Sequence, residues 1–127
     1  MSSIVLLVGR LVIAIQMGLL ALGAPVKPSG PYCWRSLSMT IAFNFHGDTF
    51  NFDWWYFIGY GSARDVPYKM NGCTTILVPI NNPKFQEAFT GMGPPFPASD
   101  FKQLSYANNA ITAHTREGDL TMTNRDC

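Results

Sequence analysis

The most restrictive feature of this 127-residue chain is a run in which large apolar side chains occupy every second position. From Phe50 to Ile58 the even-numbered positions are all aromatic or aliphatic, and the odd-numbered positions up to Asp53 are polar. Successive side chains of a strand point to opposite faces, so a period of two favours a strand with one buried face. The run therefore predicts a strand over residues 50–58.

The segment before this run supports two interpretations. Apolar residues again alternate with small or polar ones from Leu37 to Phe45, which favours a second strand. Yet Leu37, Ile41 and Phe45 are also spaced by four, Ser36 is a suitable helix cap, and Gly47 is a suitable helix end. The residues alone leave both open.

The remaining segments are shorter. Pro67 cannot donate to a sheet ladder, so residues 66–70 are predicted to be an edge segment. Pro83 suits the first position of a helix, which predicts a short helix through Phe89. The other expectations are turns at 46–48 and 71–72, loops at 59–65 and 91–99, and strands at 73–80, 101–106, 111–116 and 120–123.

The N-terminus resembles an export signal. Ile4 to Ala24 is apolar except for Arg10 and Gln16, and it ends in small residues. We expect a signal peptide over residues 1–24, an extended leader over 25–32 and one domain over 33–127. A retained membrane anchor is the alternative, although Arg10 would be costly within a membrane. A cleaved signal implies a secreted protein with no membrane contact after cleavage.

The charge excludes a broad cationic surface. The full chain carries nine Lys or Arg and eight Asp or Glu, and loss of Arg10 leaves eight of each, 8 − 8 = 0. A chain with no net charge cannot bind nucleic acid or anionic lipid through charge alone. The sequence contains no Gly-rich phosphate loop, HExxH motif or zinc-type cysteine spacing, so we expect no cofactor and no metal site.

Three cysteines enter the oxidising export route, where one bridge is expected. Loop-closure entropy does not discriminate, because Cys33–Cys73 and Cys33–Cys127 differ by less than about 1 kcal/mol. A Cys33–Cys127 bridge would fasten both ends of the folded region, so we favour it. Cys33–Cys73 is the alternative, and a bridge between two chains through Cys127 is a third arrangement.

Two histidines can titrate near neutral pH. His46 lies in a predicted turn and is expected to be solvated. His114 lies on a predicted strand and shares a face with Thr112 and Arg116. A histidine beside a cation is able to protonate a leaving oxygen or hold a phosphate, although a purely structural role is commoner.

The segment from Ile111 to Leu120, followed by the terminal Cys127, resembles the ending of secreted fungal guanyl-specific ribonucleases and ribotoxins. In that family an Ile/Val-x-x-His-Thr strand supplies the catalytic acid, and a near-terminal cysteine bonds one near the N-terminus. The segment Val66 to Asn71 looks like the family's Tyr-Pro-His segment, and Ile76 to Ile80 looks like the strand that carries its glutamate. Of the catalytic set only His114 is matched.

The departures from the family are informative. Tyr68 stands where the resemblance places the first histidine, and Leu77 stands where it places the general base. The phosphate-binding arginine has no clean counterpart, and Lys102 is the nearest. Leucine cannot accept a proton, so efficient RNA cleavage is not expected.

A secreted chain of this size with a degraded active site resembles the ribonuclease-like effectors of plant-pathogenic fungi. The resemblance implies an α+β fold, with one helix near residues 36–46 packed on an antiparallel sheet. It also implies a monomer that acts beside or inside host cells by binding host RNA or host protein. The binding candidates are Tyr68, Lys69, Lys102, His114 and Arg116.

Two other hypotheses stay open. The first is an all-β sandwich of the MAX type found among avirulence effectors, which predicts strands at 37–45 and a Cys33–Cys73 bridge. The second is an active secreted ribonuclease or toxin. It would use His114 with Tyr68 and a carboxylate such as Glu87 or Glu117.

Overall fold

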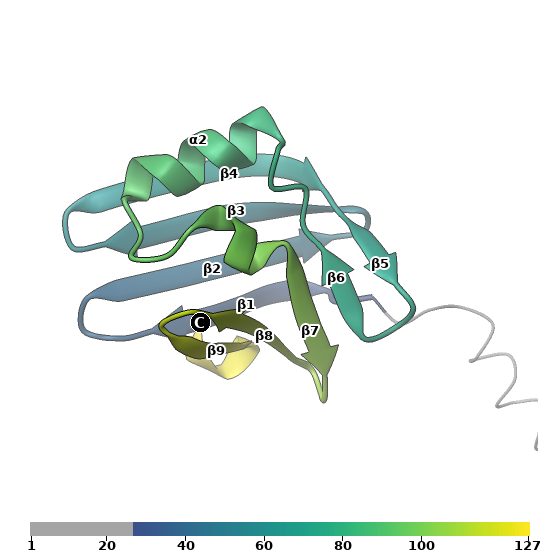
Figure 1. The fold of residues 1–127 in the computed structure, drawn as a ribbon. Coiled ribbons are helices and arrows are strands. Elements are labelled where there is room, and N and C mark those ends of the chain that lie inside the picture. Colours follow the sequence, from purple (N-terminus) through teal and green to yellow (C-terminus); the bar gives the residue numbers. More distant parts are fainter. Residues whose placement is uncertain (1–26) are drawn as a thin grey trace, which may run out of the picture.

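A single antiparallel sheet of nine strands dominates the computed structural model, which describes residues 27–127 (Figure 1). The strands are β1 (Gly30–Arg35), β2 (Met39–His46), β3 (Thr49–Tyr56), β4 (Gly59–Pro67), β5 (Lys69–Asn71), β6 (Thr75–Leu77), β7 (Gln103–Ala107), β8 (Ala110–Thr115) and β9 (Gly118–Thr123). One α-helix, α2 (Pro83–Met92), and two short 3₁₀ segments, η1 (Ala98–Phe101) and η2 (Asn124–Asp126), complete the described part.

The strand order makes the sheet nearly close on itself. It runs β4-β3-β2-β1-β9-β8-β7-β6-β5, so two meanders meet where β1 pairs with β9. The two edge strands, β4 and β5, are consecutive in the chain and are separated only by Tyr68. The Tyr68 N–H donates to the Asp48 carbonyl (3.2 Å) and so ties this link to the turn between β2 and β3. The resulting shape resembles a barrel.

An aromatic core fills the inner side of the sheet. Phe43, Phe52 and Trp54 are fully buried, and their ring centroids lie 4.7–6.5 Å apart. Helix α2 covers β3 and β4 and adds Phe85 and Phe89 to the same cluster. Asn82 caps the helix by accepting from the backbone N–H groups of Lys84 and Phe85, which fits its place before a proline.

The expectation of an α+β ribonuclease-like fold is wrong. The helix expected near residues 36–46 is absent, and strand β2 occupies that segment. Its inward side chains, Ile41, Phe43 and Phe45, follow a period of two, and β2 pairs with β1 on one side and β3 on the other. A helix would have placed Phe43 on a different face from Ile41 and Phe45, and β1 and β3 would each have lost one of their two neighbouring strands. The architecture is closer to the all-β alternative.

Two further segments differ from expectation. Residues 59–65, predicted as a loop, form most of β4, because Gly59 and Gly61 let the backbone of α2 lie directly on that strand. Residues 73–80, predicted as a central strand, form only the three-residue β6. The helix predicted from Pro83 is confirmed and extends to Met92, and Gly93 ends it in a left-handed conformation.

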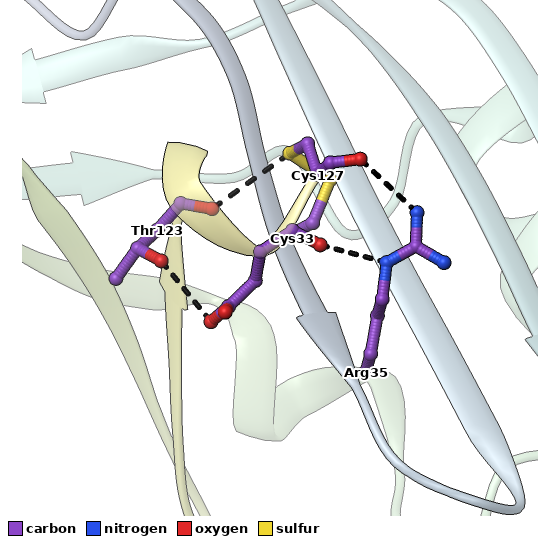
Figure 2. The surroundings of a disulfide bond; sticks show 5 residues. Cys33, Arg35, Thr123 and Cys127 are labelled. Carbon is purple, nitrogen blue, oxygen red and sulfur yellow. Dashed lines mark hydrogen bonds between the residues drawn. A yellow bond between two sulfur atoms is a disulfide. The ribbon is translucent and has the colours of Figure 1, made fainter.

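The favoured disulfide is confirmed. Cys33 bonds Cys127, and their Cα atoms are 5.1 Å apart (Figure 2). Cys33 pairs with Thr123 at the β1–β9 junction, and η2 then turns the C-terminus back over β1. Arg35 donates to the carbonyls of Asp126 (2.7 Å) and Cys127 (3.2 Å) and so holds the end of the chain. Cys73, the alternative partner, is free and exposed.

We expect a signal peptide over residues 1–24 and a leader that starts at residue 25. The signal peptide and the start of the leader lie outside the described residues. Within the described part, strand β1 begins at Gly30, and Tyr32 belongs to the core. No helix in residues 27–127 is long and apolar enough to cross a membrane.

Candidate functional site

Tyr68, matched to a family catalytic histidine, is part of the core. Its ring packs against Phe45 with centroids 5.1 Å apart, and its hydroxyl donates to the Gly47 carbonyl (2.7 Å). Burial is the main cause that raises the pKa of the Tyr68 phenol above its usual value. A phenol held in this way stabilises the β2–β3 turn and is poorly placed to exchange protons with a bound molecule.

The two candidate lysines lie near one shallow hollow. Lys69 lines it together with Tyr68 and Leu77, and its volume is about 230 Å³. The carbonyl of Lys102 accepts from the N–H of Val78, another residue of the wall, so Lys102 lies close by. The resemblance aligned Tyr68 and Leu77 with two catalytic residues, and the fold does place them together. The hollow that they share is largely apolar, and neither a carboxylate nor a histidine lines it.

His114 lies on a different surface. It is exposed on β8, and its neighbours Ile111 and Ala113 point inward to the core. His114 therefore occupies the outer face, whereas Tyr68 faces the inside. Lys69 on β5 is separated from β8 by β6 and β7, which is about 14 Å at ordinary strand spacing.

Arg116 is held away from His114 by a carboxylate. In the turn between β8 and β9 its backbone N–H donates to Asp100 (3.0 Å), and its guanidinium forms an ion pair with the same carboxylate (3.4 Å). The five predicted binding residues are therefore not assembled into one site. Within residues 27–127, no group of three or more His, Cys, Asp or Glu side chains is arranged to hold a metal ion.

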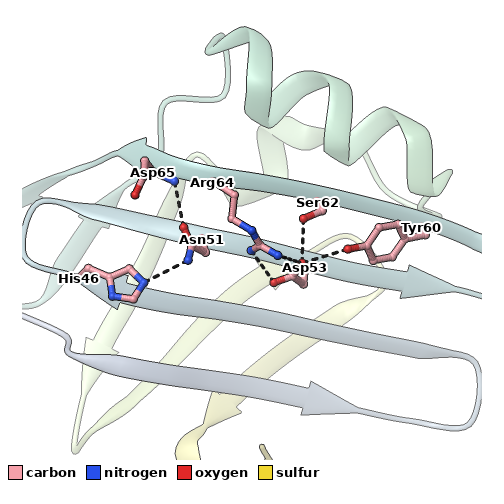
Figure 3. Close-up of polar contacts among 7 residues, drawn as sticks. All are labelled: His46, Asn51, Asp53, Tyr60, Ser62, Arg64 and Asp65. Carbon is pink, nitrogen blue, oxygen red and sulfur yellow. Dashed lines mark hydrogen bonds and ion pairs between the residues drawn. The ribbon is translucent and has the colours of Figure 1, made fainter.

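The outer face of β2–β4 carries a polar network that the sequence did not indicate (Figure 3). Asp53 accepts two hydrogen bonds from Arg64 (2.8 and 2.9 Å), one from Ser62 (2.8 Å) and one from Tyr60 (3.2 Å). Burial raises the pKa of the Asp53 carboxyl, but these donors lower it by more, so the pKa lies below its usual value. All of these groups are satisfied within the network, which makes it a structural clamp between β3 and β4.

The most unusual surface is an apolar end formed by two hairpin turns, between β1 and β2 and between β3 and β4 (Figure 1). Leu37 and Ile58 are fully exposed and Phe57 is 71% exposed. Behind them the rings of Trp55 and Tyr60, each about half exposed, contact each other at a tilt, with centroids 4.9 Å apart. These five residues are called the apolar tip below.

The apolar tip is held in one conformation. The backbone N–H of Phe57 donates to the Ser38 carbonyl (2.9 Å), which joins the two turns. Phe57 has a φ of 55°, in the left-handed region that favours glycine. A bulky residue costs about 1–3 kcal/mol there, and such costs are concentrated at functional sites. The protein therefore keeps a strained and exposed aromatic residue, Phe57, in the turn between β3 and β4.

Sequence reasoning missed the apolar tip because the alternating pattern continues past the ends of the strands. Leu37 and Ile58 continue the alternating apolar positions of β2 and β3. Both lie in turns, however, where alternation no longer predicts to which side a side chain points. Trp55 and Phe57 fall at odd positions, which are polar up to Asp53, and this break in the pattern is the available signal.

The described fold and surfaces define a small disulfide-bonded antiparallel-β protein with one covering helix and an exposed apolar tip. Comparison of the chain with protein-family models, curated proteins and solved structures yields no match.

Proposed function

We propose that this chain is a secreted binding protein that acts on a host by contacting a host protein, and not by cleaving RNA. The apolar tip is the observation that carries the proposal. Monomeric proteins rarely leave several large apolar side chains together in water, and such patches mark interaction sites. Burying the side chains of Leu37, Phe57 and Ile58 against a partner would contribute about 1.5–3 kcal/mol each.

The charges favour a protein partner over RNA or an anionic membrane. Lys27, Arg64 and Arg116 each form an ion pair with a carboxylate, so they are poorly available to phosphates. The turns that form the tip, residues 36–38 and 57–58, contain no charged residue. Binding to RNA or anionic lipid needs clustered free cations, whereas the centre of a protein interface is aromatic and poor in charge.

Two features support secretion. The apolar segment over residues 4–24 has the composition of an export signal. The Cys33–Cys127 disulfide fits a protein that folds in an oxidising compartment. The expectation of transfer into host cells rests on the resemblance to fungal effectors.

The proposal is tested by replacing the tip. A host protein captured from plant extract is produced in pure form and titrated with the purified chain. We expect the double variant Leu37→Ser, Ile58→Ser to weaken binding by at least tenfold, because both side chains are fully exposed and their loss leaves the core intact. Circular dichroism checks that the variant is folded.

Lys69→Ser is the matched control, because Lys69 is an exposed binding candidate from the sequence that lies outside the tip. Its affinity should equal that of the wild type. A tip variant with wild-type affinity, or a loss confined to Lys69→Ser, would overturn the assignment to the tip. Flotation with neutral phosphatidylcholine vesicles tests whether the tip binds a lipid surface. Sedimentation of the chain alone tests whether it binds a second copy of the same chain. Tip-dependent binding to either would replace the protein partner.

A further inference from the structure

Three neighbouring strands place a serine, a histidine and an aspartate in contact on the outer face of the sheet. Ser105 comes from β7, His114 from β8 and Asp119 from β9. His114 is directly opposite Asp119 in the β8–β9 pair, and β7 borders β8 on the other side. The sheet register therefore sets the order Ser–His–Asp.

The atoms in contact are those that nucleophilic catalysis requires. Nδ1 of His114 lies 2.8 Å from Oδ1 of Asp119, and Nε2 lies 3.2 Å from Oγ of Ser105. With the Nδ1 proton on the Asp119 side, Nε2 is left free to accept the serine proton. This arrangement of nucleophile, base and orienting carboxylate is the one by which a hydroxyl is activated.

The three side chains are open to solvent. The side chains of His114 and Asp119 are 60% and 63% exposed, and Ser105 is also exposed. The inward residues of β8, such as Ala113, hold the strand in place without them. Thr75, Thr112 and Thr121 continue the same face on the paired strands, so the surroundings are polar.

We propose that Ser105, His114 and Asp119 form an acyl-transfer site that hydrolyses small polar carboxylic esters. Ser105 Oγ attacks the acyl carbon while its proton passes to Nε2 of His114. The ester C–O bond then breaks, and the leaving alcohol takes that proton. Water, activated by the same nitrogen, releases the carboxylic acid and restores the serine. No oxidant, reductant or cofactor is needed for this sequence.

The surroundings set the rate and the substrate class. Ser105 pairs with Thr75 on one side and with Thr112 on the other, so it lies inside the sheet and has no preformed ring of backbone donors for an oxyanion. Loss of a single such donor costs about 10²–10³-fold in rate. Slow hydrolysis of esters with good leaving groups is therefore expected, and the surrounding threonines favour small polar acyl groups over long apolar ones.

The test measures release of p-nitrophenol from p-nitrophenyl acetate by the purified chain. Ser105→Ala and His114→Ala should each lower the rate at least tenfold, and Asp119→Asn should lower it several-fold. His46→Ala is the matched control, because His46 is an exposed imidazole bonded to Asn51 and has no serine partner. Its rate should equal that of the wild type.

A second readout identifies the nucleophile. A small organic fluorophosphonate should add to the wild-type chain at Ser105, as located by peptide mass spectrometry, and should not add to the folded His114→Ala variant. Hydrolysis that Ser105→Ala leaves unchanged would mean that an exposed imidazole acts alone, and it would overturn the proposal. No hydrolysis above buffer, or a label on another residue, would overturn it equally. None of these outcomes bears on the binding function proposed for the apolar tip.

Discussion

At the scale of single residues, position in the fold decides what each polar group can do. His114 was singled out from the sequence as a remnant acid, and the structure gives it Asp119 and Ser105 as partners. Neither partner was a candidate, because Ser105 lies nine residues away and the contact depends on strand register. The local sequence pattern identifies a residue that could be catalytic. The register of the strands decides which side chains lie beside it.

Asp53 gives a prediction at this scale. Asp53→Asn should lower the free energy of unfolding by about 1–2 kcal/mol near neutral pH, because charge-assisted hydrogen bonds from Arg64 are lost. The folded pKa is depressed, so this contribution is present above about pH 4 and is lost as pH falls through the folded value. Urea unfolding at pH 7 and in strong acid measures both effects.

Glu87→Gln is the control for this experiment, because Glu87 is exposed on α2 and also loses one carboxylate. Its stability should stay within about 0.5 kcal/mol of the wild type. An Asp53→Asn variant that remains equally destabilised in strong acid would refute the ionised Asp53–Arg64 pair as the source.

At the scale of elements, two glycines explain how the helix meets the sheet. A Cβ on Gly61 would lie 1.8 Å from the Ala88 carbonyl oxygen, and one on Gly59 would lie 2.4 Å from that of Met92. The backbones of β4 and α2 therefore touch with no side chain between them. Glycines are weak strand formers, which is why residues 59–65 were predicted as a loop and why packing decided otherwise.

Gly61→Ala should destabilise the protein by about 3 kcal/mol or more, because backbone atoms must move to relieve the clash. Thermal or urea unfolding measures the loss. Gly91→Ala is the matched substitution within α2, where the nearest atom would be an ordinary 3.5 Å away. It should stabilise by up to about 1 kcal/mol, since alanine favours helix over glycine. Equal stability of the two variants would contradict the close β4–α2 contact.

At the scale of the whole molecule, closure depends on two links. The chain continuity of β4 and β5 brings the sheet edges together on one side. The short β1–β9 pairing joins the two meanders on the other side, and it is reinforced by the Cys33–Cys127 bond and by Arg35. The disulfide therefore lies at the junction where the fewest strand residues pair.

Replacing Cys33 and Cys127 together by alanine should cost about 2–5 kcal/mol, because a loop of 94 residues is no longer closed in the unfolded chain. Urea unfolding of this variant measures the loss. The same experiment on Cys73→Ser should give nearly wild-type stability, because this thiol is exposed and free. A larger loss from Cys73→Ser than from the double variant would contradict the pairing.

The sequence by itself determined the local elements whose signals lie within a few residues. These are the strand around Phe52, the helix that begins at Pro83, and the cysteine at each end of the folded region. Period-two patterns and caps depend on neighbours in the chain, so they can be read without the fold.

Only the tertiary structure decided how these elements combine. The same residues 37–45 fitted a helix or a strand, and pairing with β1 and β3 selected the strand. The apolar tip and the Ser105–His114–Asp119 contact both join residues that are separate in sequence, through turn position and strand register. Side-chain alternation cannot specify either one, because it gives the face of a strand but neither where the strand ends nor which strand lies beside it.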